Sequence, residues 1–328
     1  MDNERLHFTI EIPLRNYSLV LKSDDERVID AVSDWVDHDI AECYARDQVN
    51  PRKRLLIELH AKRRPMNIGR PPRRKPTGTF EDVNFYGSGD RMYLTFGDES
   101  LVRIYPDRAM ARGYVSPDHL TSPWTLSHRV FYVPVLEIIR ALGGCYIHAG
   151  CVCRGDECIL LCGGSGHGKS TLTYALSRAR YSYLSDDAVF IQNGLNSGLD
   201  MFAFPEKIKL DRNSRSHFPE FQGFTRAPGK MEIPLKQTSI RNVAVGGRPF
   251  AILFVSLNHE KGSRIAQISR SEALLRLIGQ SVSITSREGI ERNLDLLKRL
   301  VESSRSYDFQ LGASFEGVPE LIEEALGD

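Results

Sequence analysis

One glycine-rich stretch constrains the fold of this chain more than any other part of it. Residues 163–170 read Gly-Gly-Ser-Gly-His-Gly-Lys-Ser and fit the pattern G-x-x-x-x-G-K-[ST]. An apolar run at 159–161 precedes the stretch, and Leu172, Ala175 and Leu176 follow it at helical spacing. These flanks predict a buried strand, a tight turn and the first turns of a helix.

Such an arrangement predicts a phosphate-binding loop. Small residues let backbone N–H groups curl around a phosphate, and the N-terminus of the helix directs its positive end at the anion. Lys169 would supply a cation at the β/γ oxygens and Ser170 would hold Mg²⁺. A flexible glycine loop that binds nothing is the alternative. The residues predicted to bind the nucleotide are Gly163, Gly164, Ser165, Gly166, His167, Gly168, Lys169, Ser170 and Thr171.

Composition is that of an ordinary globular protein. The 328 residues leave room for about two domains, and 41% of them are apolar. The net charge of +1 gives no global indication of a nucleic-acid or membrane partner. No apolar run has transmembrane length and the first residues are too polar for a signal peptide, so a cytoplasmic protein is expected. Five of the six cysteines fall within 145–162 without metal-ligand spacing, which predicts reduced core thiols.

The first 120 residues predict a β-rich N-terminal module. Short apolar runs indicate strands at 7–12, 17–21, 54–59, 79–85, 91–96, 101–105 and 109–115, with one helix near 28–36. Residues 62–75 are rich in Lys, Arg and Pro and contain no acid, so they predict a surface loop or a docking patch for an acidic partner.

A second, α/β domain is predicted over 121–328. It would open with a helix from Ser122 to Gly143, kinked at Pro134. Strands at 145–152 and 157–162 would then form a hairpin that leads into the glycine-rich loop.

Two adjacent carboxylates, Asp186 and Asp187, lie between short apolar segments soon after the predicted loop helix. One carboxylate can hold Mg²⁺ and the other can accept a proton from an attacking hydroxyl, which are the needs of phosphoryl transfer. Because successive side chains of a strand face opposite ways, the two aspartates need not share a role. A polar turn between strands is the alternative.

Three features in this order resemble the C-terminal catalytic domain of HPr kinase/phosphorylase: Ile147-His148-Ala149-Gly150, the stretch 163–171, and Leu184-Ser185-Asp186-Asp187. The resemblance covers about residues 140–320. It implies an α/β (α+β) P-loop kinase core of the type shared with phosphoenolpyruvate carboxykinase, with ATP and Mg²⁺ as ligands. It also implies roles for His148 as the active-site histidine, Asp186 as the general acid/base, and Asp187 as the acidic residue near the metal. Without the resemblance, His148 would read as a core histidine.

The chain departs from the HPr-phosphorylating members after the aspartates. It lacks their glycine- and arginine-containing signature and carries Phe204-Pro-Glu-Lys-Ile-Lys-Leu210, which is similar to the wider HPr-kinase-like group. Neither the reverse phosphorylase reaction nor HPr as acceptor is therefore implied. In this segment Glu206 is a candidate metal ligand, and Lys207 or Lys209 a candidate phosphate contact; a charged strand face is the alternative.

These patterns together predict an ATP-dependent kinase that transfers the γ-phosphoryl group to a hydroxyl on a protein, a peptide or a small molecule. Lys169, Asp186 and His148 are its predicted catalytic residues, and Ser170, Asp187 and Glu206 its predicted metal ligands. Two alternatives stay open: a switch that binds or hydrolyses ATP without a kinase reaction, and a scaffold that keeps the loop as an anion site. HPr kinase relatives are commonly oligomeric, so the resemblance implies a homo-oligomer.

Overall fold

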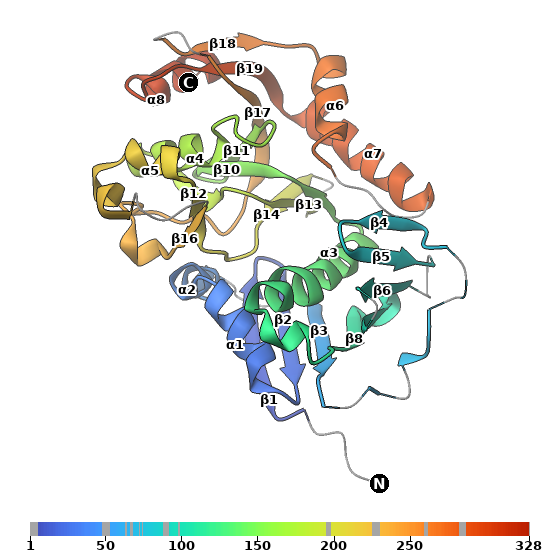
Figure 1. Ribbon diagram of the computed structural model, residues 1–328. Coiled ribbons are helices and arrows are strands. Elements are labelled where there is room, and N and C mark those ends of the chain that lie inside the picture. Colours follow the sequence, from blue (N-terminus) through green and yellow to red (C-terminus); the bar gives the residue numbers. More distant parts are fainter. Residues whose placement is uncertain are drawn as a thin grey trace. The chain divides into compact units, whose positions relative to one another are not determined.

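The fold is mixed α/β, with its strands paired into several sheets (Figure 1). The computed structural model describes residues 6–47, 53–62, 64–65, 68–71, 73, 75–87, 92–97, 99–194, 198–224, 230–258, 262–281 and 287–327. The chain divides into two compact units. The first comprises Met1–Val36, Gln48–Gly144 and Ser283–Asn293, and the second Asp37–Asp47, Cys145–Val282 and Leu294–Asp328. The predicted boundary near residue 120 falls within the first unit.

The first unit contains an eight-stranded sheet with the order β1-β2-β3-β8-β7-β6-β5-β4. The pairs β2–β3 and β3–β8 are parallel, and the other pairs are antiparallel. The strands are β1 (Phe8–Leu14), β2 (Tyr17–Ser23), β3 (Lys53–His60), β4 (Gly78–Phe80), β5 (Val83–Tyr86), β6 (Met92–Phe96), β7 (Ser100–Tyr105) and β8 (Met110–Tyr114). The described residues between β3 and β4 form no strand or α-helix, which agrees with the predicted loop.

Helix α1 (Glu26–Trp35) begins at Asp25, whose side chain accepts the N–H of Arg27. Two predictions for this unit are corrected. The single strand expected at 79–85 is two strands, because Glu81 adopts a positive φ of 52° that turns the chain. The helix kinked at Pro134 is a π-helix, Thr125–Phe131, continued by α3 (Tyr132–Ala141); Pro134 lacks the N–H that an α-helix would direct at the carbonyl of Val130.

The second unit holds three sheets. A six-stranded sheet has the order β12-β10-β11-β17-β19-β18, a three-stranded sheet the order β14-β13-β9, and β15 pairs with β16. Its strands are β9 (Cys145–Ile147), β10 (Ala149–Arg154), β11 (Glu157–Cys162), β12 (Ser182–Ser185), β13 (Val189–Asn193), β14 (Leu199–Phe202), β15 (Ile208–Leu210), β16 (Met231–Ile233), β17 (Arg248–Leu257), β18 (Arg264–Gln267) and β19 (Arg305–Leu311). Its helices are α2 (His38–Asp47), α4 (Lys169–Ala179), α5 (Arg212–Ser216), α6 (Arg270–Ile278), α8 (Val318–Leu326) and most of α7 (Arg287–Ser303).

Helix α2 was not predicted. Its buried side chains are Ile40 and Tyr44, which is too short a stripe to stand out as helical periodicity. Asp37 begins this helix by accepting the backbone N–H groups of Asp39 and Ile40 at 3.0 and 3.1 Å.

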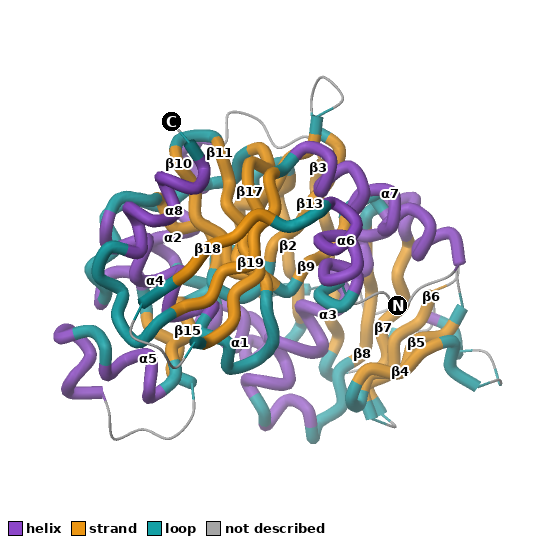
Figure 2. Tube along the Cα trace, turned by 90° about the horizontal axis from the view of Figure 1, so that it is seen from above, coloured by secondary structure: helices purple, strands orange, loops and turns teal. Residues whose placement is uncertain are grey.

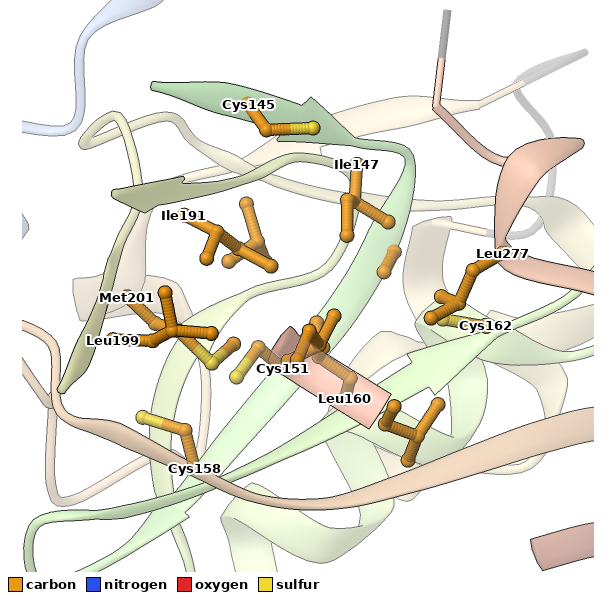
Figure 3. Packing of buried hydrophobic residues seen from close by; sticks show 14 of the residues in the cluster. Cys145, Ile147, Cys151, Cys158, Leu160, Cys162, Ile191, Leu199, Met201 and Leu277 are labelled. Carbon is orange, nitrogen blue, oxygen red and sulfur yellow. The ribbon is translucent and has the colours of Figure 1, made fainter. Parts of the chain in front are cut away.

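The six-stranded sheet is covered on both faces, so its central strands are continuously apolar. Residues of α4 and α8 pack on one face, and residues of α6, α7 and the three-stranded sheet pack on the other (Figure 2). Successive side chains of β11 point to opposite faces of the sheet. Ile159 and Leu161 pack on the face that α4 and α8 cover, while Leu160 packs on the face that α6 and α7 cover. Figure 3 shows side chains of β9, β13 and β14 against those of β10 and β11.

The predicted strand 145–152 is interrupted at His148, and this interruption positions the site. Before it the chain runs in β9, which pairs with β13; after it the chain runs in β10, which pairs with β12. Ile147 lies opposite Val189, and Cys151 lies opposite Ser185. Residues 148–150 therefore lie beside residues 186–188, at the place where both segments pass from one sheet to the other.

In the described part of the chain, every helix is too short or too polar to cross a bilayer. All six cysteines are free, and all but Cys43 are buried, which confirms the prediction of core thiols.

Gly150 offers a test of how closely α4 packs on β10. A Cβ at this position would lie 2.3 Å from the Thr173 hydroxyl oxygen, so we expect Gly150→Ala to lower the free energy of unfolding by roughly 1–3 kcal/mol. Thr173→Ala removes that oxygen, so the double variant should recover much of the loss. Chemical denaturation of the single and double variants measures both effects. A Gly150→Ala protein as stable as the parent would contradict the packing.

Candidate active site

The glycine-rich loop joins β11 to α4, so the strand and helix predicted on its two sides are both present. Gly163 passes close to the neighbouring strand β17: a Cβ there would lie 2.5 Å from the carbonyl oxygen of Val255. Gly168, directly before the helix, has a φ of 85°. A glycine is therefore required at both positions, at one for space and at the other for backbone conformation.

Lys169 folds back over the loop. Its ammonium donates to the carbonyl oxygens of Gly163 at 2.8 Å and Gly164 at 3.0 Å. The side chain is largely buried, and this burial lowers the pKa of Lys169. The ring of His167 also lies over the loop, where its Nδ1 accepts the N–H of Gly164 at 3.3 Å. The carbonyls of the loop thus hold the Lys169 ammonium at the place where the sequence predicts that a phosphate binds.

A cavity of about 380 Å³ in the second unit opens onto this loop. Most of the predicted site residues line it, including all three predicted catalytic residues. The exceptions are Gly163, Gly164, His167 and Glu206. The predicted residues in the wall are His148, Ser165, Gly166, Gly168, Lys169, Ser170, Thr171, Asp186 and Asp187.

Asp186 is almost fully buried, with 3% of its surface exposed. The Tyr183 hydroxyl donates to one carboxylate oxygen at 2.9 Å, and the backbone N–H of Lys209 donates to the other at 3.1 Å. Burial and the neighbouring charge of Asp187 raise the pKa of Asp186 to about 7. The carboxyl group is thus fixed in orientation and titrates close to neutral pH.

Asp187 lies in a different environment. His148 Nδ1 is 3.1 Å from one of its oxygens, and the Lys209 ammonium is 3.3 Å from the other. Burial alone would raise the pKa of Asp187, but the His148 hydrogen bond and the Lys209 charge outweigh it and hold this pKa well below its ordinary value. Asp187 is therefore ionised throughout the physiological range.

Lys209 links the site to Glu206. Its ammonium lies 2.5 Å from a Glu206 carboxylate oxygen, and both side chains are mostly buried. Burial alone would lower the pKa of Lys209, but the charges of Glu206 and Asp187 raise it above its ordinary value. Glu206 does not line the cavity but is joined to Asp187 through Lys209, and its predicted role as a metal ligand stays a prediction.

Ser170 and Asp187 are the residues in the cavity wall best suited to Mg²⁺. They offer a hydroxyl and an ionised carboxylate, the hard oxygen ligands that this ion prefers. The Ser170 hydroxyl lies 3.4 Å from the backbone carbonyl of Asp186, which places it beside the aspartate pair. The donor set therefore fits the predicted ion.

Tyr183 and Lys230 are site residues without a predicted catalytic or metal role. Tyr183 belongs to β12, and nothing in the sequence distinguishes it from other strand tyrosines. Lys230 lines the cavity just before β16, and its charge contributes to lowering the pKa of Asp187. The β15–β16 pairing brings Lys230 beside the wall, since Met231 lies opposite Leu210.

Comparisons with known proteins give a distant likeness. No family model matches the chain, and no curated protein matches it. Among solved structures, the chain is similar to the HPr(Ser) kinase/phosphatase from Coxiella burnetii, with 16% sequence identity, 55% of this chain and 92% of that chain covered, and a TM-score of 0.29. At that TM-score the similarity is weak.

The central position of Lys209 can be tested by removing its charge. Lys209→Met leaves two neighbouring carboxylates, Glu206 and Asp187, without their shared cation, so we expect a loss of roughly 3–5 kcal/mol in unfolding free energy. Adding Glu206→Gln should restore part of it. Lys236→Met, at an exposed position, is the matched control. Equal denaturation midpoints for the Lys209 and Lys236 variants would show that the cluster does not need its cation.

Proposed function

We propose that this protein is an ATP-dependent kinase that transfers a γ-phosphoryl group to a hydroxyl acceptor. The observation that carries the proposal is the pair of adjacent carboxylates whose pKa values are displaced in opposite directions, facing the same cavity as Lys169. Two such carboxylates divide the work of a base and of an ionised ligand between them.

In this proposal the loop and Lys169 bind the phosphate chain. The Lys169 ammonium exchanges its contacts with the carbonyls of Gly163 and Gly164 for phosphate oxygens. The start of α4 adds its dipole and unpaired N–H groups. These groups bind and orient the nucleotide, which is most of what phosphoryl transfer requires of a protein.

Asp186 takes the proton of the acceptor hydroxyl. A general base is most effective when its pKa lies near the working pH, and the pKa of about 7 meets that condition. Tyr183 and the Lys209 backbone hold both oxygens in place, so the carboxylate does not need to reorient before accepting the proton.

Asp187 stays charged, and His148 orients it. When bound, Mg²⁺ would neutralise charge on the phosphate oxygens, and Ser170 and Asp187 would hold it. A hydrogen bond holds the backbone of His148 in place, because its N–H donates to the carbonyl of Gln280 at 3.0 Å. His148 therefore acts on Asp187 as a positioning residue.

Replacing each aspartate separately tests this division of roles. Asp186→Asn should reduce transfer by about 10²–10⁴-fold while MgATP still binds, because an amide cannot accept the proton. Asp187→Asn should instead weaken MgATP binding, because it removes a carboxylate from the metal site. The measurements are an MgATP titration and the transfer of label from γ-labelled ATP to fractionated cell extract.

Folding must be checked for Asp186→Asn in particular. Only one atom of the amide can accept a hydrogen bond, so either Tyr183 or the Lys209 N–H loses its acceptor, at a cost of about 1–3 kcal/mol. A thermal melt shows whether the variant remains folded. Full transfer activity in a folded Asp186→Asn protein would contradict the kinase mechanism and favour an ATP-dependent switch.

The pH dependence of transfer provides a second test. Asp186 acts as the carboxylate, so the rate should be low below its pKa and rise through a midpoint near pH 7 to a plateau. Tyr183→Phe removes a hydrogen bond that stabilises the carboxylate, so the midpoint should move to higher pH, with recovery in alkaline buffer.

Tyr181→Phe is the matched control, because it removes the hydroxyl of another buried tyrosine, and that hydroxyl has no hydrogen-bond partner among the described residues. Its pH profile should match that of the parent. A Tyr183→Phe protein slowed equally at every pH would indicate a purely structural role for the Tyr183 hydroxyl.

A further inference from the structure

A second cavity of about 340 Å³ lies next to the first in the same unit. The C-terminal half of α4 forms one of its walls, and Phe218 and the segment 313–319 contribute the others. Three residues line both cavities: His217, Ala313 and Phe315. These three side chains therefore form a wall that the two spaces share.

The second cavity differs from the first in chemistry. None of the charged groups assigned to phosphoryl transfer lines it, and no carboxylate does. Aromatic rings gather there instead: Phe315 packs edge-on to His217 with ring centroids 5.4 Å apart, and lies 6.0 Å from the ring of Phe218. The Arg178 guanidinium lies over the Phe218 ring at 5.4 Å. Such a wall suits a flat, uncharged ring system.

The positions along helix α4 give the distance between the polar first cavity and the aromatic second cavity. Its first turn, with Ser170 and Thr171, lines the first cavity, and Ala175 and Ala179 line the second. At a rise of about 1.5 Å per residue, Ala175 and Ala179 lie about 7.5 and 13.5 Å along the axis from Ser170. This separation is on the scale of one ligand with an anionic end and a flat ring at the other end.

We infer that the second cavity binds the base of the nucleotide, and that this base is a purine, whose larger ring gives the stronger stacking on Phe315. This inference rests on the proposed function, because it needs the triphosphate on the loop. With the base in the second cavity, the acceptor would bind on the side of the first cavity that is lined by His148, Asp186 and Asp187.

Two variants separate base binding from phosphate binding. Phe315→Ala removes the ring at the junction, and Ala179→Trp fills the second cavity from an exposed position that does not line the first. Each should weaken MgATP binding by roughly 5- to 100-fold, the range of a lost base-stacking contact. Magnesium tripolyphosphate has no base, so its affinity should change less than about twofold. In the parent, ATP and GTP should bind more tightly than UTP.

The controls fix the meaning of each outcome. Leu275→Ala, at a side chain that is 72% exposed on α6, should change neither affinity, and thermal melts should show that all variants remain folded. Lys169→Ala should weaken both ligands together. If the two test variants leave ATP binding unchanged, or weaken tripolyphosphate equally, the base site is wrong while the phosphate site stands. If the parent binds neither ligand, the proposed function fails and takes this inference with it.

Discussion

The site depends on two chain segments that leave one sheet for another at adjacent points. Because β9 pairs with β13 and β10 with β12, the residues between these strands lie side by side. Their backbone groups are satisfied outside the ladders: the Ser185 hydroxyl accepts the N–H groups of Asp187 and Ala188. Freed from strand pairing, the side chains of His148, Asp186 and Asp187 can face the cavity instead of a core.

The charges around the two neighbouring carboxyl groups then separate their pKa values: the pKa of Asp186 is raised and the pKa of Asp187 is lowered. Both are close to the low-dielectric interior, but only Asp187 has an ion pair with Lys209 and a hydrogen bond with His148. Asp186 is left with neutral donors, and it also bears the repulsion of its neighbour. The same repulsion disfavours ionising Asp186 while Asp187 is charged, so the order in which the pair titrates follows from position alone.

Local patterns in the sequence were sufficient to predict those parts of the fold that depend on neighbouring residues alone. The glycine-rich loop and its flanking strand and helix follow from residue type and spacing. Contacts between distant segments leave no such pattern: nothing near Lys209 indicates that its backbone N–H donates to Asp186. The interruption at His148 is equally hidden, because the residues on both sides favour strands and only the change of pairing partner separates them.

The internal contacts of Lys169 have a consequence for selectivity. Because the ammonium already donates to two loop carbonyls, an arriving anion replaces hydrogen bonds instead of adding them, and the net gain from each is small. A single phosphate group offers little surplus over the bonds it displaces. In the proposed function a chain of phosphates would also engage the amides of the loop and the start of α4, so the loop would discriminate between anions by the length of the phosphate chain.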